Sequence, residues 1–155
     1  MSLDVEIKGP LLGQCQVCAI ALADILEWFG IEEANQKYAE ETEELPTFVA
    51  EINGDPVGFM ALKIQSPESA ELYVLGVMKA YHRSGTGKLL LAASEDDLRS
   101  QAVRFLQVKT LADLSDDENY AKTRRFYEGQ SYVTSEVFPE LWHPSNAALQ
   151  MIKHL

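Results

Sequence analysis

Hydrophobic and polar positions repeat at two spacings along this 155-residue chain, and the spacing indicates the secondary structure of each segment. Apolar residues that recur every three or four positions predict helices over residues 13–29, 32–44, 87–101 and 120–128. Alternation at every second residue, or a short run rich in Val, Leu, Ile and Tyr, predicts strands over residues 5–7, 47–52, 57–64, 71–78, 105–110, 132–138 and 147–153.

Turn residues separate these segments and indicate how the strands pair. Gly9 and Pro10 are predicted to end the first strand, and Gly30 the first helix. Asn53-Gly54 between two strand patterns predicts an antiparallel hairpin. The helix over residues 87–101 joins two strands, which predicts a crossover to a parallel neighbour. The chain is therefore expected to be α/β, with one mixed sheet and the order β-α-α-β-β-β-α-β-α-β-β.

The composition is that of a soluble globular protein, with 46% hydrophobic and 24% charged residues. The length suits a single domain over residues 1–155. No apolar run approaches the ~20 residues of a membrane-spanning helix. Residues 1–8 lack the apolar stretch of a secretory signal. We therefore expect a cytoplasmic protein that has no membrane partner.

The formal net charge of −11 argues against nucleic acid as a partner, because phosphate binding requires a basic surface. The charge is unevenly distributed. Residues 1–78 hold 14 acids and 3 bases, whereas residues 79–125 hold 7 acids and 9 bases. The basic stretch suits an anionic ligand and the acidic stretch a cationic acceptor. For the acidic stretch, a solvated surface that keeps the chain soluble is the alternative.

The two cysteines, Cys15 and Cys18, are spaced C-x-x-C. A redox pair or half of a zinc site is one interpretation of this spacing. A zinc site needs about four ligands, and no second C-x-x-C or H-x-x-x-H is present. The favoured interpretation is two small apolar residues on one face of a helix, and no metal is predicted.

A glycine-containing segment between a predicted strand and a predicted helix is the clearest candidate for chemistry. Residues 82–88 read His-Arg-Ser-Gly-Thr-Gly-Lys. Glycines let the backbone turn and approach a ligand, and the free N–H groups of the following helix point into such a loop. Together with Arg83 and Lys88, they predict a cradle for a pyrophosphate. The alternative is a plain turn between a strand and a helix.

Two other kinds of nucleotide-binding loop are excluded by single residues. The phosphate-binding loop G-x-x-x-x-G-K-[ST] fails because His82 stands at its first position and Leu89 at its last. The dinucleotide-binding loop G-x-G-x-x-G fails because Leu90 replaces the third glycine.

Residues 71–90, Glu-Leu-Tyr-Val-Leu-Gly-Val-Met-Lys-Ala-Tyr-His-Arg-Ser-Gly-Thr-Gly-Lys-Leu-Leu, resemble the central signature [QR]-x-x-G-x-[GA] of the GNAT family of N-acetyltransferases. Residues 120–128, Tyr-Ala-Lys-Thr-Arg-Arg-Phe-Tyr-Glu, resemble the family's second motif, a helix that ends in Phe-Tyr before a closing strand. The resemblance extends over about residues 4–153. There are departures: His82 replaces the usual Gln or Arg, and Ser131 the usual Gly.

The resemblance implies the acyl-CoA N-acyltransferase fold, a twisted mixed sheet of about six or seven strands flanked by about four helices. It implies that acetyl-CoA is the co-substrate and that a primary amine receives the acetyl group by direct transfer in a ternary complex. A CoA-binding regulatory module without catalysis is an alternative. Another is an acyltransferase for a different acyl group or acceptor. Dimers are common in the family.

The resemblance also implies which residues bind the coenzyme. In the family, the strand before the loop splays from its neighbour and its backbone pairs with the pantetheine arm. Gly76 in such a strand suits a bulge or a close ligand approach. The implied coenzyme-binding residues are Leu75, Gly76, Val77, His82, Arg83, Ser84, Gly85, Thr86, Gly87 and Lys88, with Tyr120 and Thr123 at positions that usually hold Asn and Ala.

Two residues are implied to be catalytic. Tyr127 of the second motif matches the tyrosine that protonates the leaving thiolate in many members. Glu71 resembles the carboxylate that serves some members as the base, and alternation predicts that Glu71, Tyr73 and Leu75 share one face. The alternatives are a half-buried aromatic residue and a solvent-facing strand residue. Trp28, Phe29 and Trp142 are candidates for the acceptor pocket, although large aromatic residues more often belong to a core. Arg124 and Arg125 either hold phosphates or are solvated.

Overall fold

The structure of the protein is a computed structural model, which describes residues 4–25, 32–111, 118–143 and 146–155. Within these ranges the backbone forms seven strands, four α-helices and one short 3-10 helix. In chain order the elements are β1 (Val5–Leu11), α1 (Cys15–Asp24), α2 (Glu32–Thr42), β2 (Thr47–Ile52), β3 (Asp55–Ser66), β4 (Ser69–Val77), η1 (Lys79–Tyr81), α3 (Thr86–Ser100), β5 (Phe105–Leu111), α4 (Glu118–Gly129), β6 (Val133–His143) and β7 (Asn146–His154).

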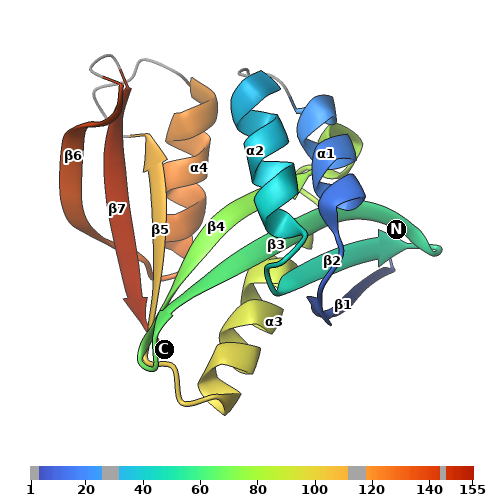
Figure 1. Cartoon of the computed structure of the whole chain (residues 1–155), viewed down its shortest axis with the longest axis horizontal. Helices are drawn as coiled ribbons and strands as arrows, with labels where there is room; N and C mark the ends of the chain where they lie inside the picture. Colours follow the sequence, from blue (N-terminus) through green and yellow to red (C-terminus); the bar gives the residue numbers. More distant parts are fainter. Residues whose placement is uncertain (1–3, 26–31, 112–117, 144–145) are drawn as a thin grey trace.

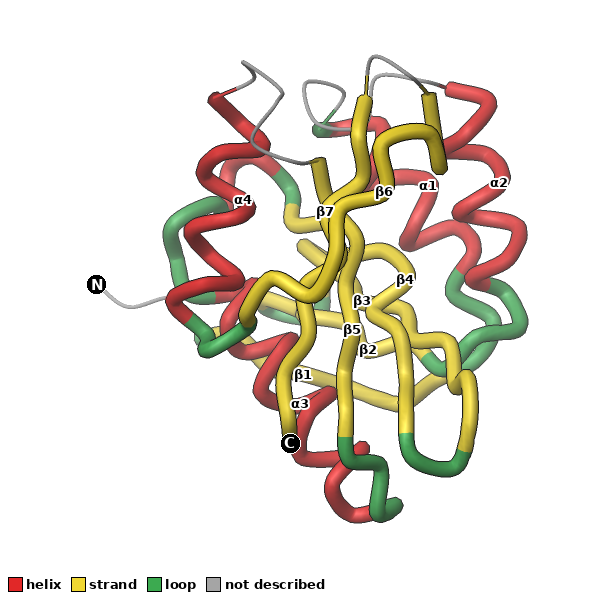
Figure 2. The backbone as a smooth tube through the Cα atoms, turned by 90° about the vertical axis from the view of Figure 1, so that its left-hand side faces the viewer, coloured by secondary structure: helices red, strands yellow, loops and turns green. Residues whose placement is uncertain are grey.

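The strands form one mixed sheet in the order β1-β2-β3-β4-β5-β7-β6. Neighbouring strands are antiparallel except β4 and β5, which run parallel because α3 connects them as a crossover. Helices lie on both sides of the sheet: α1 and α2 on one face, α3 and α4 on the other (Figures 1 and 2). The element order and the mixed sheet agree with the sequence prediction.

Each face of the sheet has its own core. On the α1–α2 face, Cys18 and Leu22 of α1 pack with Phe59 of β3 and Val74 of β4. In the larger core, on the α3–α4 face, apolar residues of α3 pack against β2, β3, β4, β5 and β7. Its fully buried members include Met60, Leu62, Ala70, Leu90, Leu98, Leu106 and Met151. The α1–α2 pair therefore forms a layer that is separate from the helices that follow the glycine loop.

The predicted hairpin is confirmed at Asn53-Gly54. Ile52 pairs with Asp55, and the two turn residues have φ angles of 53° and 84°. Positive φ at both positions is the requirement of the hairpin turn that Asn-Gly favours. The sequence signal and the backbone geometry agree at this turn.

Two predicted boundaries are wrong. The first strand does not end at Gly9 and Pro10 but continues to Leu11 with a register shift. This is possible because β1 is an edge strand, where a proline and an irregular register are tolerated. Helix α1 ends at Asp24 rather than near residue 29, and Ile25 closes it by donating to Leu22 O at 3.2 Å.

Strand β4 contains a bulge at Tyr73. Leu62 and Ala61 of β3 pair with Leu72 and Val74, so Tyr73 is an extra residue between two paired positions. A bulge bends its strand and increases the local twist. It also places two successive residues on the same face: Tyr73 and Val74 both pack on the α1–α2 side.

The bulge overturns the prediction that Glu71, Tyr73 and Leu75 share one face. Strict alternation would place all three together. The extra residue shifts the alternation, so that Leu75 packs against the core on the α3–α4 face while Tyr73 packs on the α1–α2 face.

Strands β4 and β5 separate at the same place. Their pairing runs from Ser69 with Phe105 to Leu72 with Val108, and no later pair is found among the described residues. Beyond it, β4 continues beside β3 and β5 continues beside β7. Figure 1 shows the two strands side by side where they begin and diverging along their length. We call this divergence the fork.

Within the described ranges, none of the helices combines the length and the apolar character that crossing a membrane requires.

Candidate active site

Beyond the fork, β4 has backbone groups that face away from β3. Met78 N–H donates to Val57 O at 2.8 Å. Backbone groups of successive residues alternate in direction along an antiparallel pair, so those of Gly76 face β3 and those of Leu75 and Val77 face the fork. Leu75 and the Val77 N–H therefore have the backbone direction that pairing with a pantetheine arm requires, whereas Gly76 does not. The Val77 carbonyl already accepts a hydrogen bond from His82 Nε2.

Gly76 has a packing role. A Cβ built on Gly76 would lie 3.0 Å from Phe59 Cε1 and 3.4 Å from both Ile25 Cδ1 and Leu22 Cδ2. The glycine allows the end of α1 to lie directly on β4. A glycine at this position predicted a bulge or a close ligand approach, but the bulge is at Tyr73 and α1 occupies the space beside Gly76.

The glycine loop leads directly into α3. Gly85 precedes the helix with φ of 84°, a left-handed conformation that glycine adopts without strain. Leu89 N–H is the first to bond back into the loop, to Gly85 O at 3.0 Å. Within the described part of the chain, the N–H groups of Thr86, Gly87 and Lys88 have no acceptor, as expected for the first turn of a helix. These donors and the positive end of the helix dipole fit a pyrophosphate.

Short side chains hold the loop in shape. Ser84 Oγ donates to Tyr81 O at 2.5 Å and lies 2.7 Å from Thr86 Oγ1. Thr86 is buried, whereas Arg83 and Lys88 are exposed and form no ion pair with any described residue. The loop thus offers two exposed cations around a row of amide donors, which is the electrostatic arrangement that an anionic group requires.

Two contacts join the loop to the rest of the site. His82 Nε2 donates to Val77 O at 2.6 Å, which ties the start of the loop to the end of β4. Because a carbonyl only accepts, this contact places the proton on Nε2. On the other side, Asp24 Oδ2 accepts the Lys79 N–H at 2.7 Å, which ties the end of α1 to η1.

Helix α4 meets the start of α3, so the two sequence motifs lie together. A Cβ built on Gly87 would lie 3.6 Å from Phe126 Cζ. The adjacent Tyr127 is only 4% exposed and packs in the same core as Leu72 and Val108, the last paired residues before the fork. Its ring makes edge contacts with Phe126 and with Tyr132. Burial raises the pKa of Tyr127 above its ordinary value.

The other residues of the second motif differ in exposure. Thr123 is half-buried and Arg125 is exposed. Arg124 is 7% exposed, so it does not lie on a solvated helix face. Tyr120 falls in α4, but its side chain lies outside the described part of the structure.

Glu71 lies at the base of the fork in an ion pair. Its Oε2 is 2.5 Å from Lys109 Nζ of β5 and accepts from Gln65 Nε2 at 3.3 Å. The side chain is only 14% exposed. Both contacts are made by Oε2, so the other carboxylate oxygen, Oε1, has no partner among the described residues.

The aromatic candidates for the acceptor pocket cannot be placed. Trp28 and Phe29 lie outside the described residues, and Trp142 falls in β6 with a side chain that is also outside them. Their role in the acceptor pocket therefore stays a prediction.

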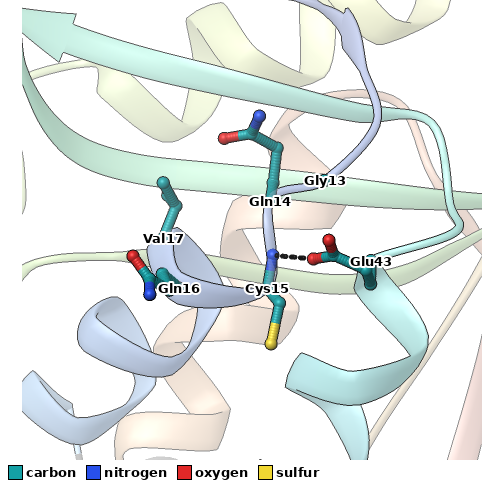
Figure 3. A pocket seen from close by; sticks show the side chains of 6 residues that line it. All are labelled: Gly13, Gln14, Cys15, Gln16, Val17 and Glu43. Atoms are coloured by element: carbon teal, nitrogen blue, oxygen red, sulfur yellow. Dashed lines mark hydrogen bonds between the residues drawn. The ribbon is translucent and has the colours of Figure 1, made fainter.

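A hollow at the start of α1 is lined by Gly13, Gln14, Cys15, Gln16, Val17 and Glu43 (Figure 3). Glu43 Oε2 accepts the Cys15 N–H at 3.0 Å and caps the helix, since Gln14 provides no side-chain cap. Asp24, which contacts η1, is at the other end of this helix, about 15 Å away at 1.5 Å per residue. The hollow is therefore separate from the glycine loop.

The cysteines are residues of α1, as the helical spacing predicts. Cys18 is fully buried, and both thiols are free. Burial raises the pKa of Cys18 to about 11, so this thiol stays protonated at neutral pH.

The sequence analysis missed a polar cluster at the base of the fork on the α1–α2 face. It consists of Glu41 of α2, Lys63 of β3, Glu71 and Tyr73 of β4, and Lys109 of β5. We call it the fork-base cluster. Only Glu71 had been singled out, because the other four residues come together through strand register and helix packing.

Comparisons with known proteins agree with this arrangement. The model of the acetyltransferase (GNAT) family matches residues 19–130. No curated protein sequence matches the chain. Solved structures share this fold at low sequence identity. The three examples that follow are each below 20% identical to this chain.

A protein from Desulfovibrio desulfuricans, described as a GNAT acetyltransferase, has a TM-score of 0.81 at 19% identity and covers 97% of this chain and 99% of its own. The ribosomal-protein-S18-alanine N-acetyltransferase from Escherichia coli has a TM-score of 0.77 at 17% identity, with 97% and 94% covered. A GNAT acetyltransferase from Elizabethkingia anophelis, solved with acetyl-CoA bound, has a TM-score of 0.71 at 15% identity, with 97% and 98% covered.

The structural similarity establishes the fold, and the family model spans more than half of the chain, including both motifs and the fork between them. This protein therefore belongs to the acetyltransferase (GNAT) family and is an acyltransferase that uses acetyl-CoA as its co-substrate.

Proposed function

We propose that the protein is an N-acetyltransferase that moves the acetyl group of acetyl-CoA directly to a primary amine while both substrates are bound. Residues His82 to Lys88 hold the pyrophosphate, and Leu75 and Val77 pair with the pantetheine arm. Tyr120 and Thr123 stay predicted contacts of the coenzyme. The amine is cationic in solution, and the protein acts as a single cytoplasmic domain over residues 1–155.

One observation carries this proposal: two rows of backbone donors lie at the two ends of the same stretch of chain. The first row is on β4 beyond the fork, and the second is at the start of α3. A pyrophosphate joined to an extended amide-containing arm matches both rows. Exposed Arg83 and Lys88 add the charge that a pyrophosphate requires.

Acetyl transfer requires a deprotonated amine and a protonated leaving sulfur. Bound acetyl-CoA supplies the acetyl group already activated as a thioester. Tyr127 carries its proton at neutral pH, because burial raises its pKa, and it donates this proton to the sulfur. Glu71 accepts a proton from the amine, directly or through a water molecule, at Oε1, the carboxylate oxygen that contacts no described residue.

The test is calorimetric titration of acetyl-CoA into the wild-type protein and into Gly85→Trp. We expect the wild type to bind in the micromolar range, at about −8 kcal/mol. The indole in the middle of the loop is expected to weaken binding about a hundredfold or more, because it displaces the anion from the helix N-terminus.

Gly54→Trp is a matched control. Gly54 and Gly85 both have φ of 84°, and a Cβ built on either meets nothing within 4 Å. Both substitutions thus impose similar backbone strain, but Gly54 lies in the β2–β3 hairpin. Unchanged affinity in Gly54→Trp, with a similar loss of melting temperature in both variants, assigns the binding defect to the loop. A wild type that does not bind acetyl-CoA would sink the proposed function.

The pH dependence of kcat tests the proton donor. An acid must be protonated to act, and a raised pKa keeps Tyr127 protonated beyond the ordinary tyrosine value of about 10. We expect kcat at saturating substrates to stay level between about pH 8 and pH 10. An alkaline decline with a midpoint below about 10 that disappears in Tyr127→Phe would contradict the environment described for this hydroxyl.

A further inference from the structure

The fork-base cluster lies where β4 and β5 part, on the face opposite Tyr127. Lys63 of β3 is in register with Glu71 of β4, and Lys109 of β5 reaches Glu71 from the other side. Glu41 comes from α2, which lies in front of β3 and β4 in Figure 1. A substrate that approaches the fork from the α1–α2 face therefore meets two lysines and two glutamates.

The charges of the cluster are balanced in pairs. Lys63 Nζ is 3.2 Å from Glu41 Oε2, and Lys109 Nζ is 2.5 Å from Glu71 Oε2. All four side chains are partly exposed, from 14% for Glu71 to 37% for Lys63. The Lys63–Glu41 pair, with about a third of each side chain in solvent, is of the weak kind that a charged substrate can replace, whereas the Glu71–Lys109 pair is more buried. Within the cluster itself, the two positive and the two negative charges cancel.

Tyrosines orient the outer pair. The Tyr73 hydroxyl donates to the Glu41 carboxylate, and this contact, together with Lys63, lowers the pKa of Glu41 below its ordinary value despite partial burial. Lys63 Nζ is 3.7 Å from the centre of the Tyr73 ring, and Tyr38 packs edge-on against the same ring at 5.2 Å. The bulge at Tyr73 thus fixes one lysine and one carboxylate beside the fork.

This pattern discriminates between classes of amine. A polyamine or an aminoglycoside carries several positive charges, and at the fork it would meet carboxylates that lysines already neutralise. An ammonium group with a carboxylate beside it can exchange partners with the existing pairs, because each of its charges finds an opposite charge. Specificity then arises in two ways. The ammonium and the carboxylate of the acceptor each meet an opposite charge, and the lysines repel a polycation.

We propose that the acceptor is an α-amino acid, or a similarly small amine with an adjacent carboxylate, and that it binds at the fork-base cluster. This inference rests on the proposed function and narrows it. Glu71 receives the amine next to the thioester, and Lys63 and Lys109 receive the carboxylate.

The amine nitrogen forms a C–N bond to the acetyl carbon, and the C–S bond of the thioester breaks. The ammonium form of the acceptor gives up two protons in all. Glu71 takes the first before attack and passes it to solvent, and the second leaves the nitrogen for solvent as the tetrahedral intermediate collapses. Tyr127 donates its own proton to the coenzyme sulfur and regains one from solvent, so that one proton is released overall.

The experiment compares matched pairs of acceptors that differ only in the carboxylate, with acetyl-CoA as donor and the acetylated product measured by mass spectrometry. Phenylalanine is paired with phenethylamine, lysine with cadaverine, and other amino acids with the amines that remain when the carboxylate is removed. We expect kcat/KM to be about tenfold or more higher for the amino acid of at least one pair, as charge-assisted contacts allow.

Lys63→Met and Lys109→Met show whether the cluster causes this preference. Each is expected to raise KM for the amino acid about tenfold relative to KM for the matched amine. Lys109→Met is expected to change kcat for both acceptors as well, because Glu71 loses its counter-charge. Lys8→Met is the control, since Lys8 forms a similar pair with Glu51 at 2.8 Å on β1 and β2, away from the fork. It should leave the ratio at its wild-type value.

Three outcomes overturn the inference. The first is equal or better use of amines that lack the carboxylate. The second is an amino-acid preference that neither lysine substitution changes. The third is normal acetyl-CoA binding without acetylation of any amino acid, which leaves the coenzyme site of the proposed function in place but removes the acceptor. Failure to bind acetyl-CoA at all is the separate result that counts against the proposed function.

Discussion

Replacing Tyr127 with phenylalanine is expected to lower kcat for acetyl transfer about a hundredfold or more, because the leaving sulfur then lacks its proton donor. KM and the melting temperature should change little. The Tyr127 hydroxyl makes no hydrogen bond with another described residue, and its ring contacts with Phe126 and Tyr132 do not involve the oxygen. Steady-state kinetics with saturating acetyl-CoA and thermal unfolding together measure both effects.

Tyr132→Phe is the matched control for this substitution. The two rings are 5.7 Å apart in the same core, but the Tyr132 hydroxyl donates to Glu95 Oε2 at 2.7 Å. Its removal should cost about 1–3 kcal/mol of unfolding free energy, as for other hydrogen bonds to charged groups, and should leave kcat of the folded protein intact. If both variants lose the same amount of kcat, Tyr127 acts through packing and not as an acid.

Glu95→Gln is expected to destabilise the protein by about 3 kcal/mol, or roughly 10 °C in melting temperature. Glu95 of α3 is buried and accepts from Lys153 Nζ of β7 at 2.9 Å and 3.1 Å as well as from Tyr132. Arg99 approaches it at 3.8 Å. Without the carboxylate, the Lys153 ammonium, which is only 19% exposed, loses its counter-charge.

The double substitution Glu95→Gln with Lys153→Met tests the cause. It removes both charges and should be more stable than Glu95→Gln alone, since the cost arises from the unpaired ammonium. Glu68→Gln serves as the exposed control, because Glu68 and Arg104 pair at 3.5 Å with more than half of each side chain in solvent. This control should change stability by less than about 1 kcal/mol. A double variant less stable than the single one would show that shape, not charge, governs this contact.

The elements and the loop could be predicted from sequence because their signals are local. The dipeptide Asn53-Gly54 is sufficient to predict its turn type, and Gly85 and Gly87 predict a turn into a helix without reference to the rest of the fold. The Phe126-Tyr127 ending of the second motif is local too. The meeting of Phe126 with Gly87 then follows from the fold that both motifs imply.

The bulge could not be predicted, because the pattern of burial conceals it. Ala70, Leu72, Val74 and Gly76 are all buried, so β4 alternates without a break along its length. The first two pack on the α3–α4 side, whereas Val74 packs on the α1–α2 side and Gly76 contacts α1. Alternation in sequence shows that a strand is buried on one side or both, but it does not show which layer covers each residue.

The partners of the charged residues could not be predicted from the sequence either. Glu71 meets Lys109 across 38 positions and Glu95 meets Lys153 across 58, through strand register and the path of α3. Glu95 has one local signal, since it follows Ser94 and precedes Leu98 on the buried side of its helix. A charged residue within a buried stripe indicates a partner but does not name it.

The extra residue at Tyr73 makes the length of this segment as important as its composition. Paired residues of β3 and β4 share a face, so the number of residues after Tyr73 decides the side that the end of the strand takes. Deleting one residue between Val74 and Val77 would shift the register with β3 and turn the residues that follow to the opposite side of the sheet. An insertion a few positions later would do the same to the end of the strand. The fold therefore fixes the number of residues between Glu71 and Gly85. Related chains are expected to tolerate substitutions within this segment far more readily than insertions or deletions.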